Sequence, residues 1–446
     1  MAVCSTINRC VPRINSAFRF SLLNRYQSGS TAEFQYEAKI NPYKDDRLEL
    51  SQTENMLDIG ARRIYTQDHD MFRRSVRRFF VENVLPHQMR YEKQGFVDRE
   101  MWEMMGKAGM LGLNTSTEMG GHGADFKFAS IVDEEQCFLN DVGTNGWKVH
   151  SNIVMPYIEE YGTAGQQQKY LPDMTAGKLI GAIAMTEPQA GSDLQGIRTN
   201  AKRDGEDWIL NGSKVFITNG HVCDMVIVVA ITDLQVKHKA HGISLFLVDA
   251  DSAGFSKGKP LQKIGQKATD TAELFFDDVR LPKEALLGDE PLMNKGFYCL
   301  MKQLPRERLI VSLSAQALSE CMFEMTREYV KKRQVFGKSL SNVQTVQHRL
   351  AEMKTEICVT RSFADQCLEL FGENRLDNSS VSMLKYRTTD LSTKVASECL
   401  QLHGGWGYML EHPIARAFTS AKVNTIYGGT SEVMKELIAR DICAEK

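Results

Sequence analysis

The chain has 446 residues, of which 54 are basic and 56 acidic, and 42% are hydrophobic. This length allows a large core in two or three regions, and the balanced charge argues against nucleic acid or an anionic membrane as the main partner. The longest apolar runs are strand-sized, so we predict no transmembrane segment. Ten cysteines without a C-x-x-C pair and ten histidines without H-E-x-x-H spacing predict neither a disulfide framework nor a metal site, and favour a reducing compartment.

The first thirty residues differ in composition from the rest of the chain. They contain four arginines and several serines, and the first acidic residue is Glu33. A basic, acid-free start of this kind is typical of a mitochondrial presequence, so residues 1–30 are predicted to be removed in the mitochondrial matrix. The alternative is an N-terminal arm without regular structure.

Three regions follow, with an α+β organisation. Residues 58–177 are predicted to form an N-terminal helical domain, in which Met71, Val76, Phe79, Phe80 and Val84 recur near helical spacing and Pro86 acts as a stop. The glycine-rich stretch "EMGGHGAD" lacks the phosphate-binding order and predicts a turn between helices.

Residues 178–288 contain short β-branched and aromatic runs separated by Gly, Asn and Asp, such as "MVIVVAI" and "GISLFLVD". They predict a middle antiparallel β-domain, barrel-like in form, with "LNGSK" as a hairpin turn. Residues 289–446 return to helical periodicity and predict a C-terminal helical bundle, with helices at 306–333, 345–370, 380–402 and 431–439.

Five motifs stand in one order along the chain. "MTEPQAGSDLQGIRT" and "NGSKVFITNG" lie in the β-region, and "KKRQVFGKSLSNVQ", "QLHGGWGY" and "IYGGTSEVMKELIAR" lie in the C-terminal helical region. Taken alone, the first two are compatible with an ordinary strand and loop. Together the five resemble the acyl-CoA dehydrogenase family, and the resemblance covers nearly all of the chain after residue 58.

The resemblance implies an FAD site. Its implied cofactor-binding residues are Ile183, Ala184, Met185, Thr186, Ser192, Phe216, Ile217, Thr218, Arg333, Phe336, Gln344, Gln401, Leu402, His403, Gly404, Gly405, Thr430, Ser431 and Glu432. Arginine suits a pyrophosphate, glycines allow close backbone approach, and a helix start offers free N–H groups. In the family, the residues that correspond to Arg333, Phe336, Gln344 and Gln401–Gly405 come from a neighbouring subunit. The resemblance therefore implies a homo-oligomer, and we expect a homotetramer.

The reaction that the resemblance implies, dehydrogenation of an acyl-CoA, also requires a basic side chain. Most family members place a glutamate where this chain has Gly428, while a smaller branch places the acid in an E-R-L segment, which here reads "LPRERLIV". The resemblance therefore assigns the catalytic role to Glu307. The alternative is an ordinary charge in the first turn of a helix that starts after Pro305. The nearest other acids, Glu432 and Glu436, are placed inside the closing helix.

The same resemblance names a substrate-binding set: Ser192, Tyr298, Arg308, Gly428 and Gly429. Of these, Arg308 is open between a substrate-side cation and a buried structural one, and Tyr298 between substrate contact and core. Where the family usually has glycine, this chain has Gln189. If that position requires a positive φ, the substitution costs on the order of 1 kcal/mol.

The implied reaction is α,β-dehydrogenation of a long-chain fatty acyl-CoA to the trans-2-enoyl-CoA in β-oxidation, with electrons passed to electron-transferring flavoprotein. The sequences of these motifs resemble those of the long-chain members more than those of the isovaleryl branch, which stays open as an alternative. An acyl-CoA oxidase and a flavin-binding assembly protein of the same fold are further alternatives. The chain ends in "CAEK", without the S-K-L of a peroxisomal oxidase.

Overall fold

A computed structural model describes residues 61–140 and 145–444. The predicted presequence, residues 1–30, lies outside this range. Internal contacts divide the chain into two compact units, residues 1–86 and 87–446.

The described part of the first unit is one helix, α3 (Gln67–Phe79), which continues as a π-helical turn, Phe80–Val84. The helix starts at Thr66, whose backbone N–H donates to Nδ1 of His69 at 3.1 Å. Val76, Phe80 and Val84 are fully buried, as their spacing predicts, but Met71 is 48% exposed and faces away from them.

The second unit begins with six short helices. They are α4 (Gln88–Gln94), α5 (Arg99–Lys107), α6 (Phe126–Phe138), α7 (Gly146–Val149), α8 (Met155–Tyr161) and α9 (Ala164–Thr175). The "EMGGHGAD" stretch joins α5 to α6, and its last residue, Asp125, caps α6 by accepting from the N–H of Lys127 at 2.8 Å. The predicted turn is therefore found between helices.

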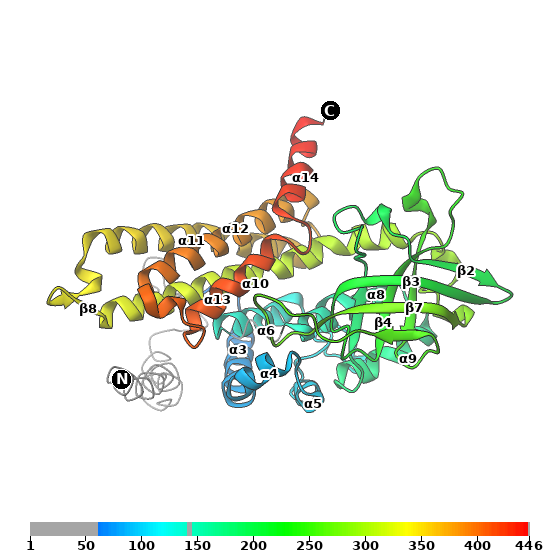
Figure 1. The fold of residues 1–446 in the computed structure, drawn as a ribbon, viewed down its shortest axis with the longest axis horizontal. Coiled ribbons are helices and arrows are strands. Elements are labelled where there is room, and N and C mark those ends of the chain that lie inside the picture. Colours follow the sequence, from blue (N-terminus) through cyan, green and yellow to red (C-terminus); the bar gives the residue numbers. More distant parts are fainter. Residues whose placement is uncertain (1–60, 141–144, 445–446) are drawn as a thin grey trace, which may run out of the picture. The chain divides into compact units, whose positions relative to one another are not determined.

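The middle of the chain is a curled seven-stranded sheet, on the right in Figure 1. Its strands are β1 (Gly181–Ala184), β2 (Asn200–Asp204), β3 (Asp207–Thr218), β4 (Met225–Ile231), β5 (Ile243–Asp249), β6 (Phe255–Lys257) and β7 (Thr271–Leu281). They follow the order β1-β4-β2-β3-β7-β6, with β5 beside β4. Each face of the sheet carries its own apolar core, and α8 and α9 belong to one of them.

The sheet differs from the expected antiparallel one in two pairings: β1 and β4 run parallel, with Ile183 opposite Ile227, and β2 and β4 run parallel, with Asn200 opposite Ile231. A parallel neighbour needs a crossover, and here the β2–β3 hairpin provides it. The hairpin turn predicted at "LNGSK" is wrong. These residues lie inside β3, where Gly212 has a φ of +146° and marks a bulge against β7. The turn between β2 and β3 is instead at Gly205.

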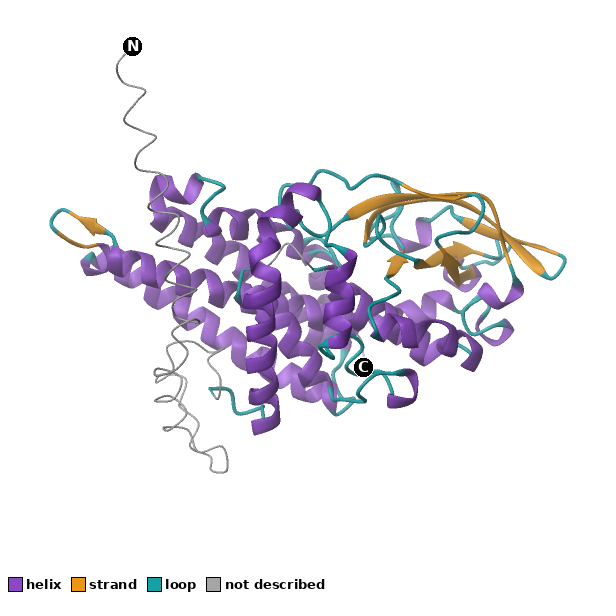
Figure 2. Ribbon diagram, turned by 90° about the horizontal axis from the view of Figure 1, so that it is seen from below, coloured by secondary structure: helices purple, strands orange, loops and turns teal. Residues whose placement is uncertain are grey.

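The C-terminal region is a helical bundle, shown with the sheet in Figure 2. Its helices are α10 (Gly296–Lys332), α11 (Gln344–Gly372), α12 (Asn378–His403), α13 (Pro413–Ala421) and α14 (Ser431–Cys443). A small hairpin, β8 (Gln334–Val335) with β9 (Lys338–Ser339), joins α10 to α11. Helix α10 is 37 residues long and contains Pro305, so the predicted start after this proline is wrong.

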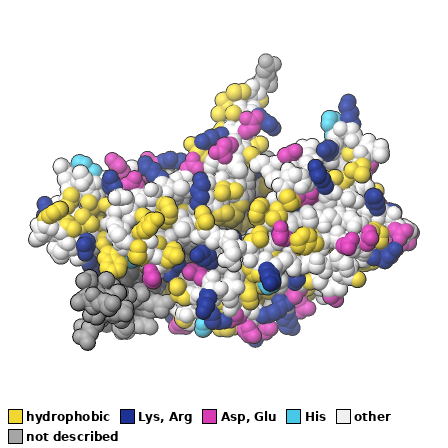
Figure 3. All heavy atoms as spheres, in the orientation of Figure 1, with side chains coloured by type: hydrophobic (Ala, Val, Ile, Leu, Met, Phe, Trp, Pro, Cys, Tyr) yellow, Lys and Arg dark blue, Asp and Glu magenta, His cyan; other side chains and the backbone are white. Residues whose placement is uncertain are grey.

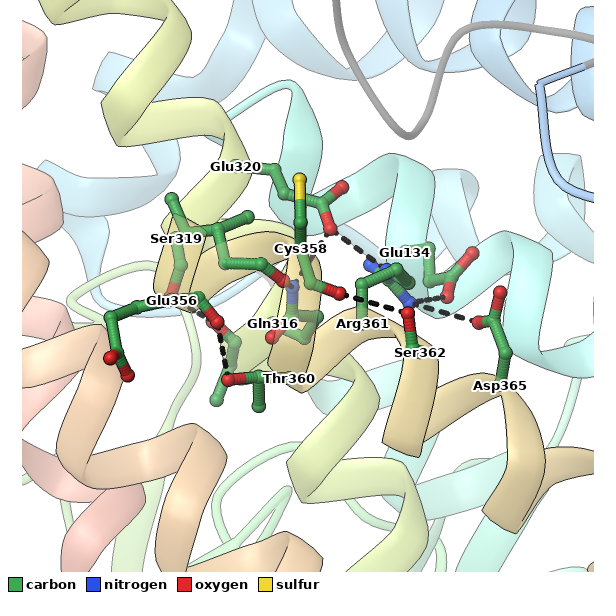
Figure 4. Close-up of polar contacts among 12 residues, drawn as sticks. Glu134, Gln316, Ser319, Glu320, Glu356, Cys358, Thr360, Arg361, Ser362 and Asp365 are labelled. Atoms are coloured by element: carbon green, nitrogen blue, oxygen red, sulfur yellow. Dashed lines mark hydrogen bonds and ion pairs between the residues drawn. The ribbon is translucent and has the colours of Figure 1, made fainter. Parts of the chain in front are cut away.

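A buried charge cluster ties three helices together (Figure 4). The guanidinium of Arg361 on α11 donates to Glu134 of α6 and to Glu320 of α10, both at 2.8 Å. All three side chains are almost fully buried. Removing one member of such a cluster leaves an uncompensated charge in the core, so the cluster fixes how α6, α10 and α11 meet.

Among the described residues, no helix has the length and apolarity needed to cross a membrane. Within the same residues, no three His, Cys, Asp or Glu side chains come together in a way that could hold a metal ion.

Candidate active site

Glu307 is buried in the middle of the second unit. It is in the fourth turn of α10, so the alternative of an ordinary charge near the positive end of a helix does not fit its position. Its Oε1 accepts a hydrogen bond from the hydroxyl of Tyr157 on α8 at 3.1 Å. Burial raises the pKa of Glu307 to about 7, and the Tyr157 hydrogen bond and the nearby Arg308 oppose this rise.

The glycine pair of the "IYGGTSEVM" motif lies against the same face of α10. A Cβ placed on Gly428 would meet only one side chain, Val311, at 3.6 Å. Val311 follows Glu307 by four residues, so the two side chains share a face of the helix. Space is therefore open at Gly428, on the side of α10 from which Glu307 projects. Both Gly428 and Gly429 have a positive φ, of +65° and +97°, which favours glycine at each position.

Helix α14 starts directly after the glycines. The hydroxyl of Thr430 caps it by accepting from the N–H of Val433 at 3.2 Å, and the hydroxyl of Ser431 donates to Asp390 of α12 at 2.8 Å. Glu432, in the first turn, is exposed, and its hydrogen bond to its own backbone N–H is the main reason that its pKa is lowered. The start of α14 thus presents N–H groups and hydroxyls, the donors that an anionic or polar ligand needs.

Two buried cations flank Glu307 and the glycines. The ammonium of Lys385 on α12 donates to the carbonyl of Gly429 at 2.6 Å. Burial lowers the pKa of Lys385 to about 8, and Arg308 contributes to this by repulsion while Asp390 and Glu432 oppose it. The Nε of Arg308 is buried and has no hydrogen-bond partner among the described residues. An orphaned donor beside the candidate base fits a substrate-side cation better than a structural one.

The predicted middle-domain residues lie together where β1 and β3 end. The N–H of Val215 donates to the carbonyl of Thr186 at 2.9 Å, which places the end of β1 beside the end of β3. Ala184 and Ile217 point into the core, so only their backbones can face a ligand. Phe216 is 66% exposed with a φ of +61°, an unusual conformation for an aromatic residue. The remaining members of this group are at least partly accessible: Ile183, Met185, Thr186, Ser192 and Thr218.

A buried ion pair shapes the loop after β1. Lys214 of β3 donates to Oε1 of Glu187 at 2.9 Å and to the carbonyl of Met185 at 3.0 Å. Burial lowers the pKa of Lys214 to about 8, because the loss of hydration outweighs the attraction of Glu187. Glu187 also accepts from the N–H of Thr199 at 3.0 Å. Gln189 does not adopt a positive φ and donates to Glu187 at 2.6 Å, so its presence causes no backbone strain.

A pocket of about 520 Å³ lies at the C-terminal ends of α10 and α12. Its lining includes Arg333 and the whole predicted stretch Gln401, Leu402, His403, Gly404 and Gly405. A Cβ on Gly404 or Gly405 would meet nothing within 4 Å, so the backbone there is open to a ligand. His403 stacks on Tyr329, and its Nδ1–H donates to the carbonyl of Cys399 at 2.8 Å. Burial lowers the pKa of His403 to about 4, as expected for a packing role.

Two residues of the predicted set do not line this pocket. Phe336 is 98% exposed at the turn of the β8–β9 hairpin, and Gln344 is the first residue of α11. Further exposed apolar side chains follow the glycine loop: Trp406, Tyr408, Met409 and Leu410. Figure 3 shows hydrophobic side chains on the surface of this end of the bundle. Neighbouring exposed apolar side chains of this kind are typical of an interface between protein chains.

The pocket and Glu307 are far apart within one chain. Tyr329, which lines the pocket, follows Glu307 by 22 residues of α10, or about 33 Å along the helix axis. Two residues of the predicted substrate-binding set lie away from this pocket. Tyr298 is 64% exposed in the first turn of α10, at its N-terminal end, and Ser192 is exposed in the loop after β1.

Sequence models of the acyl-CoA dehydrogenase N-terminal, middle and C-terminal domains match residues 66–178, 182–279 and 294–443. The long-chain specific acyl-CoA dehydrogenase of Sus scrofa mitochondria is 58% identical over 402 residues, which are 90% of this chain and 93% of that protein. The chain belongs to the acyl-CoA dehydrogenase family. The mitochondrial isovaleryl-CoA dehydrogenase of Pongo abelii, another acyl-CoA dehydrogenase, is 32% identical over 85% of this chain and 90% of that protein.

Solved acyl-CoA dehydrogenase structures agree with this membership. The enzyme of Geobacillus kaustophilus superposes with a TM-score of 0.84 at 45% identity, covering 86% of this chain and all of that one. A glutaryl-CoA dehydrogenase of Mycobacterium smegmatis, solved in complex with FADH2, superposes with a TM-score of 0.78 at 30% identity, covering 86% of this chain and 96% of that one. Acyl-CoA dehydrogenases use FAD, and the three-region fold predicted from the sequence is that of the family.

Sequence reasoning missed four polar residues around these sites. Tyr157, Lys214, Tyr329 and Lys385 each contact a predicted site residue. Tyr157 is 150 residues away from its partner, and no local pattern could connect them. Lys214 and Lys385 are fully buried lysines, and charged side chains are rarely buried without a role in pairing. The sequence shows their charge but not their burial.

Proposed function

We propose that this chain is a long-chain acyl-CoA dehydrogenase of the mitochondrial matrix, which converts a fatty acyl-CoA to the trans-2-enoyl-CoA and passes the electrons to electron-transferring flavoprotein. The observation that carries the chemical part is Glu307, a buried carboxylate with a pKa of about 7 on the face of α10 that is open at Gly428. The greater identity to the long-chain relative than to the isovaleryl relative supports the choice of substrate.

Glu307 acts as the base that takes the α-proton of the acyl thioester. A carboxylate with a pKa near 7 is a far better base than one in water, yet it is still largely ionised at the alkaline pH of the matrix. The hydroxyl of Tyr157 holds one carboxylate oxygen and leaves the other available. Bound FAD supplies the acceptor for the β-hydrogen, which leaves as hydride.

Backbone N–H groups of the Gly428–Thr430 loop stabilise the charge that develops on the thioester oxygen. Such donors are fixed before the reaction and act in a dry site, where they are most effective. The buried guanidinium of Arg308 adds a positive charge next to Glu307. The residues at the ends of β1 and β3 hold the flavin end of the cofactor, with Phe216 available to pack on the rings.

The pocket around Arg333 holds the pyrophosphate side of an FAD that belongs to another copy. A distance of about 33 Å along α10 is too long for one cofactor to reach both this pocket and the cavity of Glu307 in the same chain. The exposed apolar side chains near the pocket supply the interface. An assembly of several copies, a tetramer as is typical of the family, therefore completes each site.

The test is a set of anaerobic single-turnover measurements on the purified flavoprotein. Palmitoyl-CoA should bleach the flavin, and Glu307→Gln should keep its yellow FAD and bind acyl-CoA while bleaching at least about a thousandfold more slowly. The exposed Glu436→Gln serves as the matched control and should bleach normally. Near-normal bleaching by Glu307→Gln would show that another group is the base, and faster bleaching with isovaleryl-CoA would assign the chain to the branched-chain enzymes.

A further inference from the structure

Two side chains of α12 form hydrogen bonds with the Gly428–Ser431 loop. Lys385 donates to the carbonyl of Gly429 at 2.6 Å, and Asp390 accepts from the hydroxyl of Ser431 at 2.8 Å. Lys385 is fully buried, whereas Asp390 is partly exposed. We propose that Lys385 and Asp390 form a clamp that positions this loop, and that Lys385 is thereby a positioning residue for proton abstraction from the thioester. The proposal rests on the proposed function and adds a residue that the motifs did not indicate.

Burying Lys385 at this position costs free energy. An ammonium group loses its hydration when it is buried, and burial lowers the pKa of Lys385 to about 8. An apolar side chain of similar length would fill the same volume without this cost. The hydrogen bond of Lys385 goes to a backbone carbonyl in a glycine loop. The bond therefore fixes the orientation of this loop and does not join two helices.

The geometry of the peptide links the bond of Lys385 to the donors of the loop. The peptide unit between Gly429 and Thr430 is planar, and its C=O and N–H point in opposite directions. When the carbonyl of Gly429 points to Lys385 on α12, the N–H of Thr430 must point away from α12. The two glycines have φ values of +65° and +97°, and glycine can leave such a conformation easily. The hydrogen bond from Lys385 selects one orientation of the donors.

The charge of Lys385 also acts on the loop electrostatically. A positive charge at the carbonyl oxygen polarises the peptide and strengthens its N–H as a donor, an effect that is large in a low dielectric. The charged groups that face Lys385 are Asp390, Arg308 and Glu432. Arg308 also follows Glu307 in sequence and acts on its charge, so the charges of Lys385, Arg308 and Glu307 influence one another. The clamp therefore acts on the enolate-like charge rather than on the resting thioester.

The test separates proton removal from hydride transfer. In 3-thiapalmitoyl-CoA, sulfur replaces the β-carbon, so the bound thioester can lose its α-proton but cannot be oxidised. Its ionised form lies beside the flavin and gives a long-wavelength absorption band, and titration of this band yields the α-proton pKa of the bound analogue. We expect Lys385→Met to raise that pKa by about one unit and to lower kcat for palmitoyl-CoA about tenfold, with a smaller change in KM.

The matched control is Lys394→Met, an exposed lysine on the same helix, which should leave the band and kcat unchanged. Lys385→Arg should restore part of the effect, because it keeps a cationic donor. Asp390→Ala removes the second half of the clamp from a partly exposed position and should raise the pKa of the analogue by a smaller amount. If Lys385→Met does not fold, Asp390→Ala decides.

An unchanged analogue pKa in Lys385→Met, or in Asp390→Ala where the former does not fold, overturns the clamp. A stability loss in Lys385→Met without any change in the analogue pKa also overturns it, because a purely structural lysine would behave in that way. The wild-type protein is measured in parallel, and its failure to bleach with palmitoyl-CoA would contradict the proposed function instead.

Discussion

The hydroxyl of Tyr157 donates to the carboxylate of Glu307 across 150 positions of sequence, at 3.1 Å. This bond favours the ionised carboxylate and limits the rise in its pKa, which burial brings to about 7. A base that is too strongly shifted would be protonated at working pH, and one that is not shifted would be too weak. Tyr157 therefore adjusts the basicity of Glu307.

The pH dependence of activity should report this balance. Because the ionised form of Glu307 is the active one, kcat/KM for palmitoyl-CoA should fall about tenfold per pH unit below about pH 7 and level off above it. Tyr157→Phe removes a donor to the carboxylate, so its acidic limb should move to higher pH. Tyr161→Phe, whose ring contacts Tyr157 but whose hydroxyl does not bond to Glu307, should leave the limb in place. A Tyr157→Phe limb that moves to lower pH would contradict the assignment.

Stability should depend on Glu307 in the opposite direction to activity. Its pKa is higher in the folded state than the ordinary value of 4.5, so the folded state binds the proton more tightly and loses stability as the pH rises from about 4.5 through about 7. The loss is at most about 3 kcal/mol. Glu307→Gln should therefore melt several degrees higher than the wild type at pH 8 and close to it at pH 4.5. Thermal unfolding of both holoproteins at the two pH values checks this, and a lower melting temperature at pH 8 would contradict it.

The ion pair of Lys214 and Glu187 should matter for both stability and cofactor binding. Lys214→Met leaves a buried carboxylate without its cation and should lower the free energy of unfolding by about 3–5 kcal/mol. It should also lower the FAD content, because Glu187 holds the backbone of the loop after β1. Lys202→Met, on the exposed side of β2, is the control, and the double variant with Glu187→Gln should recover part of the loss. Denaturant unfolding and absorbance of the bound flavin give the two readouts.

Arg333 should affect FAD retention without affecting the fold. Arg333→Gln removes the cation from the rim of the pocket and should weaken FAD binding at least about tenfold, while size-exclusion chromatography with light scattering should show the same oligomer. Arg375→Gln, an exposed arginine that pairs with Glu373, should retain its cofactor. Full FAD occupancy in Arg333→Gln at low cofactor concentration would remove this pocket from the site.

Much of the fold could be predicted because the local patterns agree with the tertiary structure. The helices expected at 345–370 and 380–402 correspond to α11 (Gln344–Gly372) and α12 (Asn378–His403), whose periodicity is regular. Two of the errors, the helix start after Pro305 and the hairpin turn at "LNGSK", have a common cause. Pro305 and the Asn-Gly of "LNGSK" are strong local stop and turn signals, but α10 and β3 continue through them because long packed neighbours hold both elements in place.

The candidate site was predicted in part. The five motifs predict the ends of β1 and β3 and the pocket of Arg333 and Gln401–Gly405, and the separate segment "LPRERLIV" predicts Glu307. The residues that tune these groups are not in the motifs, since Tyr157, Lys214 and Lys385 act through contacts made across the fold. Phe336 shows the converse limit: it is 98% exposed in the single chain, so its predicted role in FAD binding stays a prediction.

The length of α10 has a genetic consequence. Under the proposed arrangement, Glu307 serves one catalytic centre while the pocket that follows Tyr329 on the same helix serves the centre of a sister copy. A lesion at Glu307 and a lesion at Arg333, carried by different alleles, would in a mixed pair fall together in one centre and leave the other intact. Two inactive alleles should then complement each other, whereas the same two lesions on a single allele should not.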